Sequence, residues 1–442
     1  MLKHDPHGHR SPETSHRLQR GIDMLRQCDQ SADLIPPEMC NDDALSNTSK
    51  KSAHNLSHFI PPRLATKEEV YTFHDKAVYE DFLEKGTVLE NLKSDVYCNE
   101  GTSSRAVKLS VGGIIDASSL ILQNVTRTTP AKEPSDSIFS SFCLLRPPGH
   151  HCTANRPSGF CLVNNVCLAA ENLMRKCTVP EGSTTRPPRI AILDLDVHFG
   201  EGIAEYVDHF QSSSGECPLL YLSIHRYDDG GFYPFEKTAD ATFTGAGNKG
   251  SIGNMAIDTH ASDVEKCEQV ISDFLLEKLI DKVVLPRLDR FKPDLLFVSM
   301  GFDAAYGDPL GKMAVESGFC RSVAALKRWC TSGNSSKPPV GLVVALEGGY
   351  SPEAVALGIL HVSYALTYAP DSALVKHFSE PKVPRTWGEL RLKQERKYAQ
   401  WEKSEQLASE KPPQLTLDDT TLLKKHVQWC DAQVKKFSSL VA

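Results

Sequence analysis

The chain has 442 residues, of which 40% are hydrophobic and 24% charged, and its formal net charge at pH 7 is −7. This is the composition of an ordinary globular protein, and an acidic balance does not favour nucleic-acid binding, which requires a basic face. No apolar run approaches the roughly 20 residues that span a bilayer, and the polar start predicts no secretory signal, so we expect neither nucleic acid nor membrane as a partner. The thirteen cysteines include no Cys-x-x-Cys pair, which favours reduced, packed thiols in an intracellular protein.

Five short apolar runs, rich in β-branched and aromatic residues, predict the strands of a sheet. They span residues 138–145, 189–197, 218–224, 293–300 and 341–346. Each run is too short and too continuously apolar for a surface helix, as expected of a central parallel strand that is covered on both faces. Helical patterns lie between several of them, at 160–176 and 265–291. This alternation predicts an α/β fold with a mostly parallel central sheet flanked by helices.

The remaining segments indicate how the chain is organised. Residues 28–62 are polar and proline-containing, which predicts a long loop insertion. Thr66, with Glu69 three residues later, predicts a capping box at the start of a helix over 66–86. The composition becomes charged and helical from Pro381 onward. We therefore expect one domain over residues 1–380 and a helical C-terminal flank over 381–442.

Polar residues follow each of the five apolar runs. The segments, in chain order, are "RPPGHH", "HFGEG", "HRYDDGGFYPF", "GFDAAYGDPLG" and "EGGYSP". In open parallel sheets the carboxyl ends of the strands form the ligand crevice. The repeated placement therefore predicts a single site at that edge of the sheet.

The second run, "RIAILDLDV", ends in an unusual group of side chains. If the strand continues through it, Asp194, Asp196 and His198 share one face, because residues two apart point the same way. Asp303, after the fourth run, can add a further carboxylate. One imidazole and two carboxylates suit a divalent ion such as zinc, with room for water and substrate. The alternative is that Asp196 and His198 pair with each other or with an arginine.

Two further groups carry candidate chemistry. His150 and His151 lie on a stiff Pro-Pro-Gly loop, and an imidazole beside a metal-bound water is a suitable general base. Asp194 and Glu201 could accept the proton on the other ring nitrogen of these histidines. Tyr350 follows two glycines, which would let its phenol approach the metal and donate to an oxyanion. The alternative is that the glycines mark a turn and that Tyr350 is an exposed loop aromatic.

Four aromatic residues near these loops could line a narrow apolar slot or form ordinary core. They are Phe160, Phe232, Tyr233 and Phe235.

These segments together resemble the histone deacetylase family, whose members are zinc-dependent enzymes of the arginase/deacetylase fold. The matching segments run in the family's order from about residue 10 to 370, and two of them, "HRYDDGGFYPF" and "LEGGY", resemble the class II branch. The others are "RPPGHH", "GFCLVNN", "LDLDVHFGEG" and "SMGFDAAYGDPLG".

The resemblance implies a role for each site residue. It implies zinc ligands at Asp196, His198 and Asp303. It implies His151 as general base and acid with Glu201 behind it, and His150 as its electrostatic partner with Asp194 behind it. It further implies that Tyr350 polarises the acyl carbonyl, and that Phe160 and Tyr233 flank the acetyl-lysine stem with Gly159 nearby. Arg17 would lie near an acetate exit path. A structural potassium ion would bind to Asp194, Ser223 and the backbone carbonyls of Asp196, His198 and Ile224. Asp95 is our candidate for gripping the substrate backbone.

The chain departs from the family pattern at several positions. Phe199 stands where a histidine is usual, Glu201 replaces a shorter Asp or Asn, and Tyr233 replaces a usual Phe. The chain begins where members generally already have a first strand, so we expect the native protein to be longer. A variant subgroup that is weak on acetyl-lysine has histidine in place of the tyrosine, so Tyr350 favours real deacetylase activity.

The resemblance thus implies a zinc-dependent hydrolase that removes acetyl groups from lysine side chains, with acetylated protein tails as substrates and corepressor-type proteins as partners. The expected location is the nucleus, the cytoplasm or both. Two alternatives are an acetylpolyamine deacetylase, which would want acidic residues at the entrance such as Asp228, Asp229 and Glu236, and a non-catalytic scaffold that binds acylated lysine. Arginase-type chemistry is disfavoured because one Asp/His cluster stands out, whereas a binuclear site requires two.

Overall fold

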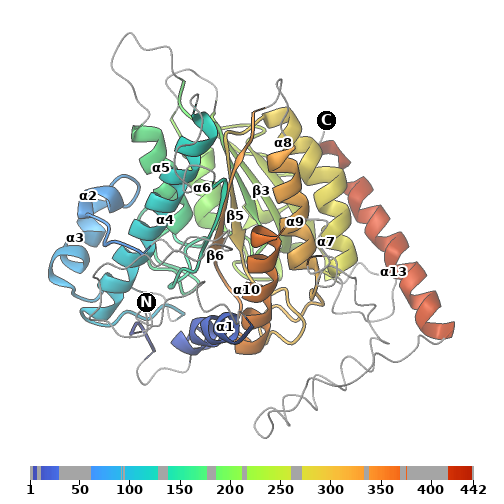
Figure 1. The fold of residues 1–442 in the computed structure, drawn as a ribbon, viewed down its shortest axis with the longest axis horizontal. Coiled ribbons are helices and arrows are strands. Elements are labelled where there is room, and N and C mark those ends of the chain that lie inside the picture. Colours follow the sequence, from blue (N-terminus) through green and yellow to red (C-terminus); the bar gives the residue numbers. More distant parts are fainter. Residues whose placement is uncertain are drawn as a thin grey trace, which may run out of the picture.

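A parallel six-stranded sheet lies at the centre of the computed structural model (Figure 1). The model describes residues 3–6, 11–28, 61–90, 92, 95–127, 138–176, 186–211, 217–259, 271–332, 338–368, 375 and 417–440. The strands, in the order β1-β6-β5-β2-β3-β4 across the sheet, are β1 Ser140–Cys143, β2 Ile190–Asp194, β3 Leu219–Arg226, β4 Ile252–Ile257, β5 Leu295–Met300 and β6 Gly341–Leu346. Every neighbouring pair is parallel, so the predicted α/β fold is confirmed.

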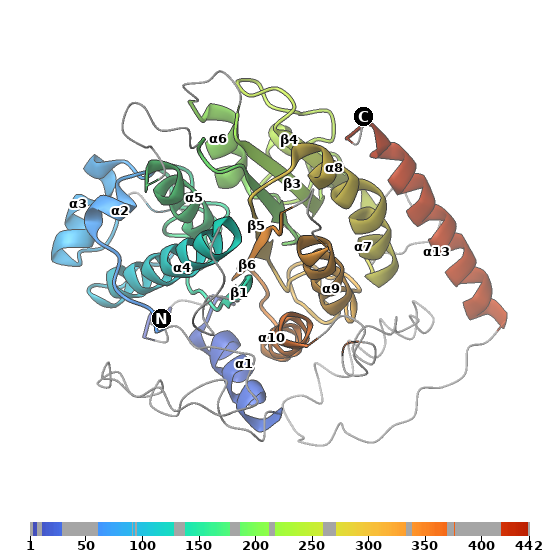
Figure 2. The ribbon, with the colours of Figure 1, turned by 45° about the horizontal axis from the view of Figure 1, so that its top comes forward.

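Two hydrophobic cores cover the two faces of the sheet. Alternate residues of a strand enter opposite cores, as Ile192 and Leu193 of β2 do, which explains why the strands read as continuous apolar runs. One face is covered by α4 (Thr102–Thr126), α5 (Asn165–Lys176) and α6 (Glu201–His209) (Figures 1 and 2). The other is covered by α7 (Asp273–Leu279), α8 (Leu285–Phe291), α9 (Gly318–Thr331) and α10 (Pro352–Thr367), and α1 (Ser15–Cys28) packs against α10.

All five predicted strands exist, but the sequence pattern missed β4. This strand is "IGNMAI", and its glycine and asparagine interrupt the β-branched pattern that marked the others. As the edge strand beside β3 it tolerates residues that pack less well. Strand β4 pairs with Ser223 and Ile224 of β3, whereas Asp196, His198 and Asp303 follow β2 and β5, so the omission does not change the placement of these three.

The predicted helix over residues 66–86 is two helices. Thr66 forms the expected capping box with Glu69 at the start of α2 (Lys67–Val70). The chain then turns, and the Asp75 side chain accepts a hydrogen bond from the Ala77 N–H to start α3 (Lys76–Lys85). A second N-cap inside an apolar periodic pattern is the signal that the prediction overlooked.

Helix α4 corrects the expectation about membrane-length apolar segments. By length and composition its 25 residues could cross a bilayer, although Arg105, Lys108 and Asp116 interrupt the run. Most of the apolar window is buried inside the protein, where α4 packs on α5, β1 and β6. An apolar helix of this kind is what a sheet-covering core position requires.

Part of the predicted C-terminal flank is helical. Helix α13 (Leu417–Lys436) packs against α7, where His426 Nε2 lies 2.7 Å from Ser272 Oγ, and a short 3₁₀ turn (Ser438–Leu440) follows (Figure 2). The helical pattern between 381 and 416 and most of the loop at 28–62 lie outside the described residues. The boundary at residue 380 stays a prediction.

Candidate active site

Loops at the carboxyl edge of the sheet bring the predicted chemical groups together. Strands β2 and β5 are neighbours, with Asp194 in register with Ser299, so the loops that follow them start side by side. The groups come from four loops: His150 and His151 after β1, Asp196 and His198 after β2, Asp303 after β5, and Tyr350 after β6.

Strand β2 ends earlier than the sequence pattern predicts. It stops at Asp194, so Asp196 and His198 do not alternate along a strand, and the predicted shared face is wrong. The two residues lie in the loop, where the His198 N–H donates to Asp196 Oδ1 at 2.9 Å and the Asp196 N–H donates to Asp194 Oδ1 at 3.1 Å. The loop is favoured because its backbone N–H groups solvate carboxylates that burial would otherwise leave unpaired.

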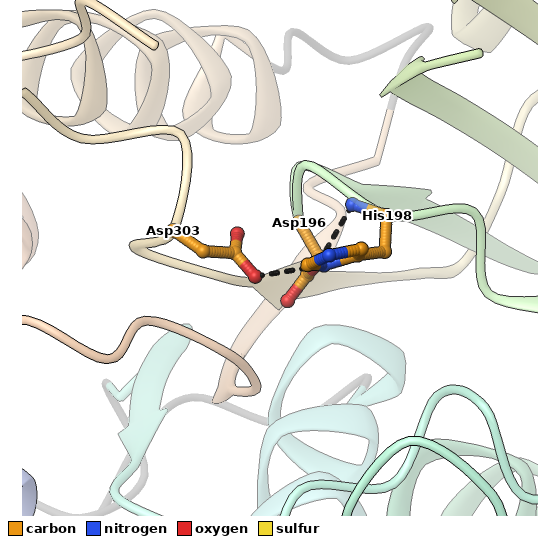
Figure 3. A group of neighbouring side chains, drawn as sticks. All are labelled: Asp196, His198 and Asp303. Carbon is orange, nitrogen blue, oxygen red and sulfur yellow. Dashed lines mark hydrogen bonds and ion pairs between the residues drawn. The ribbon is translucent and has the colours of Figure 1, made fainter. Parts of the chain in front are cut away.

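Asp196, His198 and Asp303 form a compact buried cluster (Figure 3). One ligand atom from each residue lies within 4.8 Å of the others. His198 Nδ1 lies 3.1 Å from Asp196 Oδ1 and 3.0 Å from Asp303 Oδ2. Among the residues that the structure describes, this is the one cluster of this kind, which does not match the binuclear site of an arginase.

The cluster fits a bound cation in charge and in space. Burial alone lowers the pKa of His198, but hydrogen bonds to the two carboxylates raise it to about 10, so the cluster attracts positive charge. A Cβ at Gly348 would lie 2.4 Å from Asp303 Oδ2 and 2.5 Å from Asp196 Oδ2, so only glycine leaves these oxygens open. One imidazole and two carboxylates are a ligand set found at catalytic zinc.

The two histidines of the "PPGHH" loop are adjacent but differ in environment. His151 Nδ1 lies 2.6 Å from Glu201 Oε2, so the carboxylate accepts the Nδ1 proton and Nε2 is left as the basic nitrogen. Burial and the neighbouring His150 lower the pKa of His151, which favours the neutral ring.

His150 is held between two carboxylates. Its Nδ1 lies 3.1 Å from Asp194 Oδ2, and its Nε2 lies 3.7 Å from Asp196 Oδ1. Burial opposes the charged form, yet the carboxylates of Asp196 and Asp194 raise the pKa of His150 well above its usual value. His150 is therefore the cationic ring of the pair and His151 the neutral one.

Tyr350 is buried rather than exposed, which excludes the reading as a surface turn aromatic. A Cβ at Gly348 would lie 3.1 Å from the Tyr350 hydroxyl, so the phenol and the two carboxylates of the cluster approach the same point. Burial and the carboxylate of Asp303 raise the pKa of Tyr350, so its hydroxyl remains a donor.

Sequence reasoning missed two residues that hold these loops. Asp308 Oδ2 accepts hydrogen bonds from the Tyr350 N–H at 2.6 Å and the Ser351 N–H at 3.2 Å. Glu347 Oε2 accepts from the Gly149 N–H at 2.7 Å and the His150 N–H at 3.2 Å. Both stand inside segments singled out in the sequence, and the available signal was a carboxylate next to a glycine, Asp308 after Gly307 and Glu347 before Gly348.

Aromatic rings pack against the histidines and the tyrosine of the site. Tyr233 packs edge-on against His151 at a centroid distance of 5.0 Å, Phe232 stacks on His198 at 5.1 Å, and Phe160 lies 5.3 Å from Tyr350. Phe235 is 63% exposed and forms neither core nor wall. A Cβ at Gly159 would lie 2.2 Å from His151 Cδ2, so the wall beside His151 is backbone. Asp95 Oδ2 accepts hydrogen bonds from the Gly159 N–H and the Tyr233 hydroxyl.

The remaining predicted residues lie behind the site. Arg17 donates from Nε to the Gly349 carbonyl at 2.6 Å and lies over the Tyr350 ring at 5.4 Å. Ser223 of β3 is in register with Asp194, and its Oγ lies 2.8 Å from His225 Nδ1. Phe199 is fully buried and packs with the α4–α6 core. The nine cysteines whose side chains the structure describes form no disulfide with one another, in agreement with the prediction of reduced, packed thiols.

Comparison with known proteins places these features in a family. A histone deacetylase domain profile matches residues 11–366. "Histone deacetylase HDA1" of Saccharomyces cerevisiae is 31% identical over 385 residues, covering 86% of this chain and 47% of that protein. "Histone deacetylase 6" of Caenorhabditis elegans is 30% identical over 294 residues, covering 66% and 27%. The chain spans less than half the length of these two relatives.

A solved structure agrees with the fold. The crystal structure of the HDA15 HD domain superposes with a TM-score of 0.62 at 24% sequence identity, covering 90% of this chain and 97% of that one. The profile match extends over most of the chain and includes every candidate ligand and both histidines. The resemblance read from the sequence motifs is thereby confirmed, and the chain belongs to the histone deacetylase family.

Proposed function

We propose that the chain is a zinc-dependent hydrolase that removes acetyl groups from the side chains of lysines in proteins. The observation that carries this proposal is the buried cluster of Asp196, His198 and Asp303, which lies beside a neutral His151 and a protonated Tyr350. Zinc held by the three ligands would polarise an acyl carbonyl and lower the pKa of a water molecule to about 7.

The protein's own residues would then move the protons. His151 would accept a proton from water at Nε2, because Glu201 holds the proton on Nδ1, and would later give it to the leaving lysine amine. His150 would remain charged between Asp194 and Asp196, which keeps His151 neutral and ready to accept. Tyr350 would donate a hydrogen bond to the oxygen on which negative charge develops.

The slot would bind the substrate by shape and polarity. Phe160 and Tyr233 would flank the methylene stem of acetyl-lysine, with the backbone of Gly159 between them. A neutral acetyl-lysine would enter this apolar passage more easily than free lysine, whose charge would be poorly solvated there. Asp95, on the Tyr233 side, would accept a backbone N–H of the peptide.

We further propose that a structural potassium ion binds to Asp194, Ser223 and the carbonyl groups of Asp196, His198 and Ile224. Support comes from the pairing of Asp194 with Ser223 across β2 and β3, which places a carboxylate and a hydroxyl at one level of the sheet. Oxygen donors of this kind suit a hard cation. The names of the relatives favour acetylated histones as substrates. From the family resemblance we also propose other acetylated protein tails as substrates, corepressor-type partners, and a nuclear or cytoplasmic site of action.

An assay of the zinc-loaded protein against peptides with different acyl groups on lysine tests the proposal. Hydrolysis of acetyl-lysine, lost after chelation and restored by zinc, is the expected result. Inactivity against every acyl peptide, with zinc bound, would overturn it.

Acetylspermidine provides the second arm of the assay. The entrance favours this alternative only weakly, since Asp228 is engaged by Arg226 and Thr259 rather than facing a cationic ligand. A preference for acetylspermidine over the acetyl-lysine peptide would indicate a polyamine deacetylase. Tight binding of the peptide without turnover would indicate a non-catalytic scaffold.

A further inference from the structure

A strained turn forms one wall of the slot. Ser158 and Cys161 exchange backbone hydrogen bonds of 3.2 and 2.8 Å, and the two residues between them have positive φ, +53° at Gly159 and +65° at Phe160. Two central residues with positive φ define a type I′ turn. Glycine adopts this conformation freely and phenylalanine does not, so the turn that presents Phe160 requires support from outside.

Asp95 and Tyr233 supply that support. The Gly159 N–H donates to Asp95 Oδ2 at 3.1 Å, and the Tyr233 hydroxyl lies 2.9 Å from the same oxygen. The Tyr233 hydroxyl also lies 2.9 Å from Ser158 Oγ. The Tyr233 hydroxyl therefore links Asp95 to Ser158, the first residue of the turn.

The directions of these hydrogen bonds follow from the chemistry of the groups. A carboxylate only accepts, so the Tyr233 hydroxyl donates to Asp95. Its single proton is then used, and the Ser158 hydroxyl must donate to the Tyr233 oxygen. Burial raises the pKa of Tyr233, so the phenol keeps this proton. Removal of the hydroxyl would break both hydrogen bonds at once.

The second oxygen of Asp95 has no hydrogen-bond partner in the part of the chain that the structure describes. Oδ1 is buried and makes no hydrogen bond among the described residues. A buried carboxylate oxygen without a donor is unfavourable, and a ligand N–H would satisfy it. The Tyr233 ring meanwhile packs edge-on against His151 and His198, so the same residue touches the reaction centre and orients Asp95.

We propose that the Tyr233 hydroxyl is a positioning group that selects peptide substrates, by holding Asp95 so that Oδ1 meets a backbone N–H beside the acetyl-lysine. The proposal rests on the function proposed above. It separates two contributions: the ring of Tyr233 walls the slot for any acetylated amine, whereas its hydroxyl acts only on substrates with a peptide backbone.

Tyr233→Phe in the zinc-loaded protein tests this division. Two substrates are compared, a capped tripeptide with a central acetyl-lysine and N-pentylacetamide, which keeps the side-chain amide and lacks the backbone. The ratio of kcat/KM for the tripeptide to that for N-pentylacetamide should fall about tenfold, mainly through KM. Asp95→Ala should lower the ratio similarly, and adding Tyr233→Phe to it should lower the ratio no further.

Tyr227→Phe is the matched control, because Tyr227 belongs to the same loop as Tyr233. The Tyr227 hydroxyl makes no hydrogen bond among the described residues, whereas the Tyr233 hydroxyl does. This variant should keep the wild-type ratio. Equal losses on both substrates in Tyr233→Phe, or additive losses in the double variant, would overturn the proposal.

Fluorescence anisotropy with the labelled tripeptide separates this inference from the proposed function. If the wild-type protein binds the tripeptide but hydrolyses neither substrate, the proposed function fails. In that case, equal Kd values for the wild type and Tyr233→Phe would overturn the inference as well. A Kd about tenfold higher in Tyr233→Phe would support it. If the wild-type protein neither binds nor hydrolyses the peptide, both proposals fail.

Discussion

Two buried charged clusters contact the loop that carries Tyr350, and they differ in how their charge is balanced. In the first, Glu13 pairs with Arg17 at 3.0 Å and with Arg146 at 2.8 Å, and Tyr97 donates to the same carboxylate. In the second, Asp196 and Asp303 have His198 between them, His150 lies 3.7 Å from Asp196, and no arginine among the described residues forms an ion pair with either carboxylate. Both clusters are buried to the same degree.

The comparison shows how burial can serve either structure or chemistry. The Glu13 cluster contains its own counter-charges, and Arg17 uses its remaining donors on the carbonyl oxygens of Glu347 and Gly349. It therefore anchors the loop that leads to Tyr350. Among the described residues the Asp196 cluster has only imidazoles as positive partners, His198 and the more distant His150 that Asp194 shares. An imidazole, unlike a guanidinium, can give up its proton when a metal ion binds, so this cluster is suited to take a cation from solution.

The largest expected effect comes from removing a carboxylate of the unbalanced cluster. Asp303→Ala should lower the zinc content from about one ion per chain to nearly none and reduce turnover roughly a thousandfold or more. Inductively coupled plasma mass spectrometry and the peptide assay measure the two effects. Asp281→Asn, which alters an exposed carboxylate, is the control. Full zinc binding by Asp303→Ala would remove Asp303 from the ligand set.

Removal of the carboxylate from the balanced cluster should act on stability instead. Glu13→Gln leaves the buried Arg17 without its carboxylate partner and Arg146 with only the partly exposed Asp5 at 3.3 Å, so the free energy of unfolding should fall by about 3 kcal/mol. Guanidinium unfolding followed by circular dichroism measures it. Asp81→Asn breaks an exposed pair with Lys85 and should leave the unfolding midpoint unchanged. An unchanged midpoint in Glu13→Gln would mean that the cluster is not an anchor.

The groups beside the cluster should affect turnover without affecting metal binding. Tyr350→Phe and His151→Ala should each slow turnover by roughly a hundredfold or more, with zinc retained. Tyr350→Phe loses the donor to the oxyanion, and His151→Ala loses the general base. Tyr368→Phe removes a phenol at the surface and should have no effect. Near-normal turnover by both site variants would refute the roles assigned.

The smallest effect concerns the carboxylate behind the base. The Glu201 carboxylate raises the pKa of His151, opposing burial and His150. Glu201→Gln should therefore lower the pKa of His151 further. The neutral base then persists to lower pH, and the acid limb of the kcat/KM profile shifts to lower pH. The rate itself should fall roughly tenfold, because the ring is held less well. A profile of kcat/KM from about pH 5 to about pH 9 measures both the rate and the position of the acid limb. A shift of the acid limb to higher pH would contradict the assignment.

The sequence alone predicted the chemical groups more accurately than their local geometry. Apolar runs ending in polar loops predicted five strands and one common edge, because parallel strands must meet at their carboxyl ends. The same pattern placed Asp196 and His198 on a strand face, although β2 ends at Asp194. Alternation cannot distinguish a strand from a loop whose backbone N–H groups bind the carboxylates.

Residue identity and spacing, read together with a family resemblance, determined the fold class and predicted which residues gather at the candidate site: the Asp/His cluster, the two histidines and the tyrosine. The tertiary structure alone decided which groups balance one another. Glu347 reaches the His150 loop from almost 200 positions away, Arg146 and Arg17 converge on Glu13, and Tyr233 meets Asp95 from a separate loop. These pairings depend on how separate loops pack against one another, and the sequence pattern within each loop carries no information about that packing.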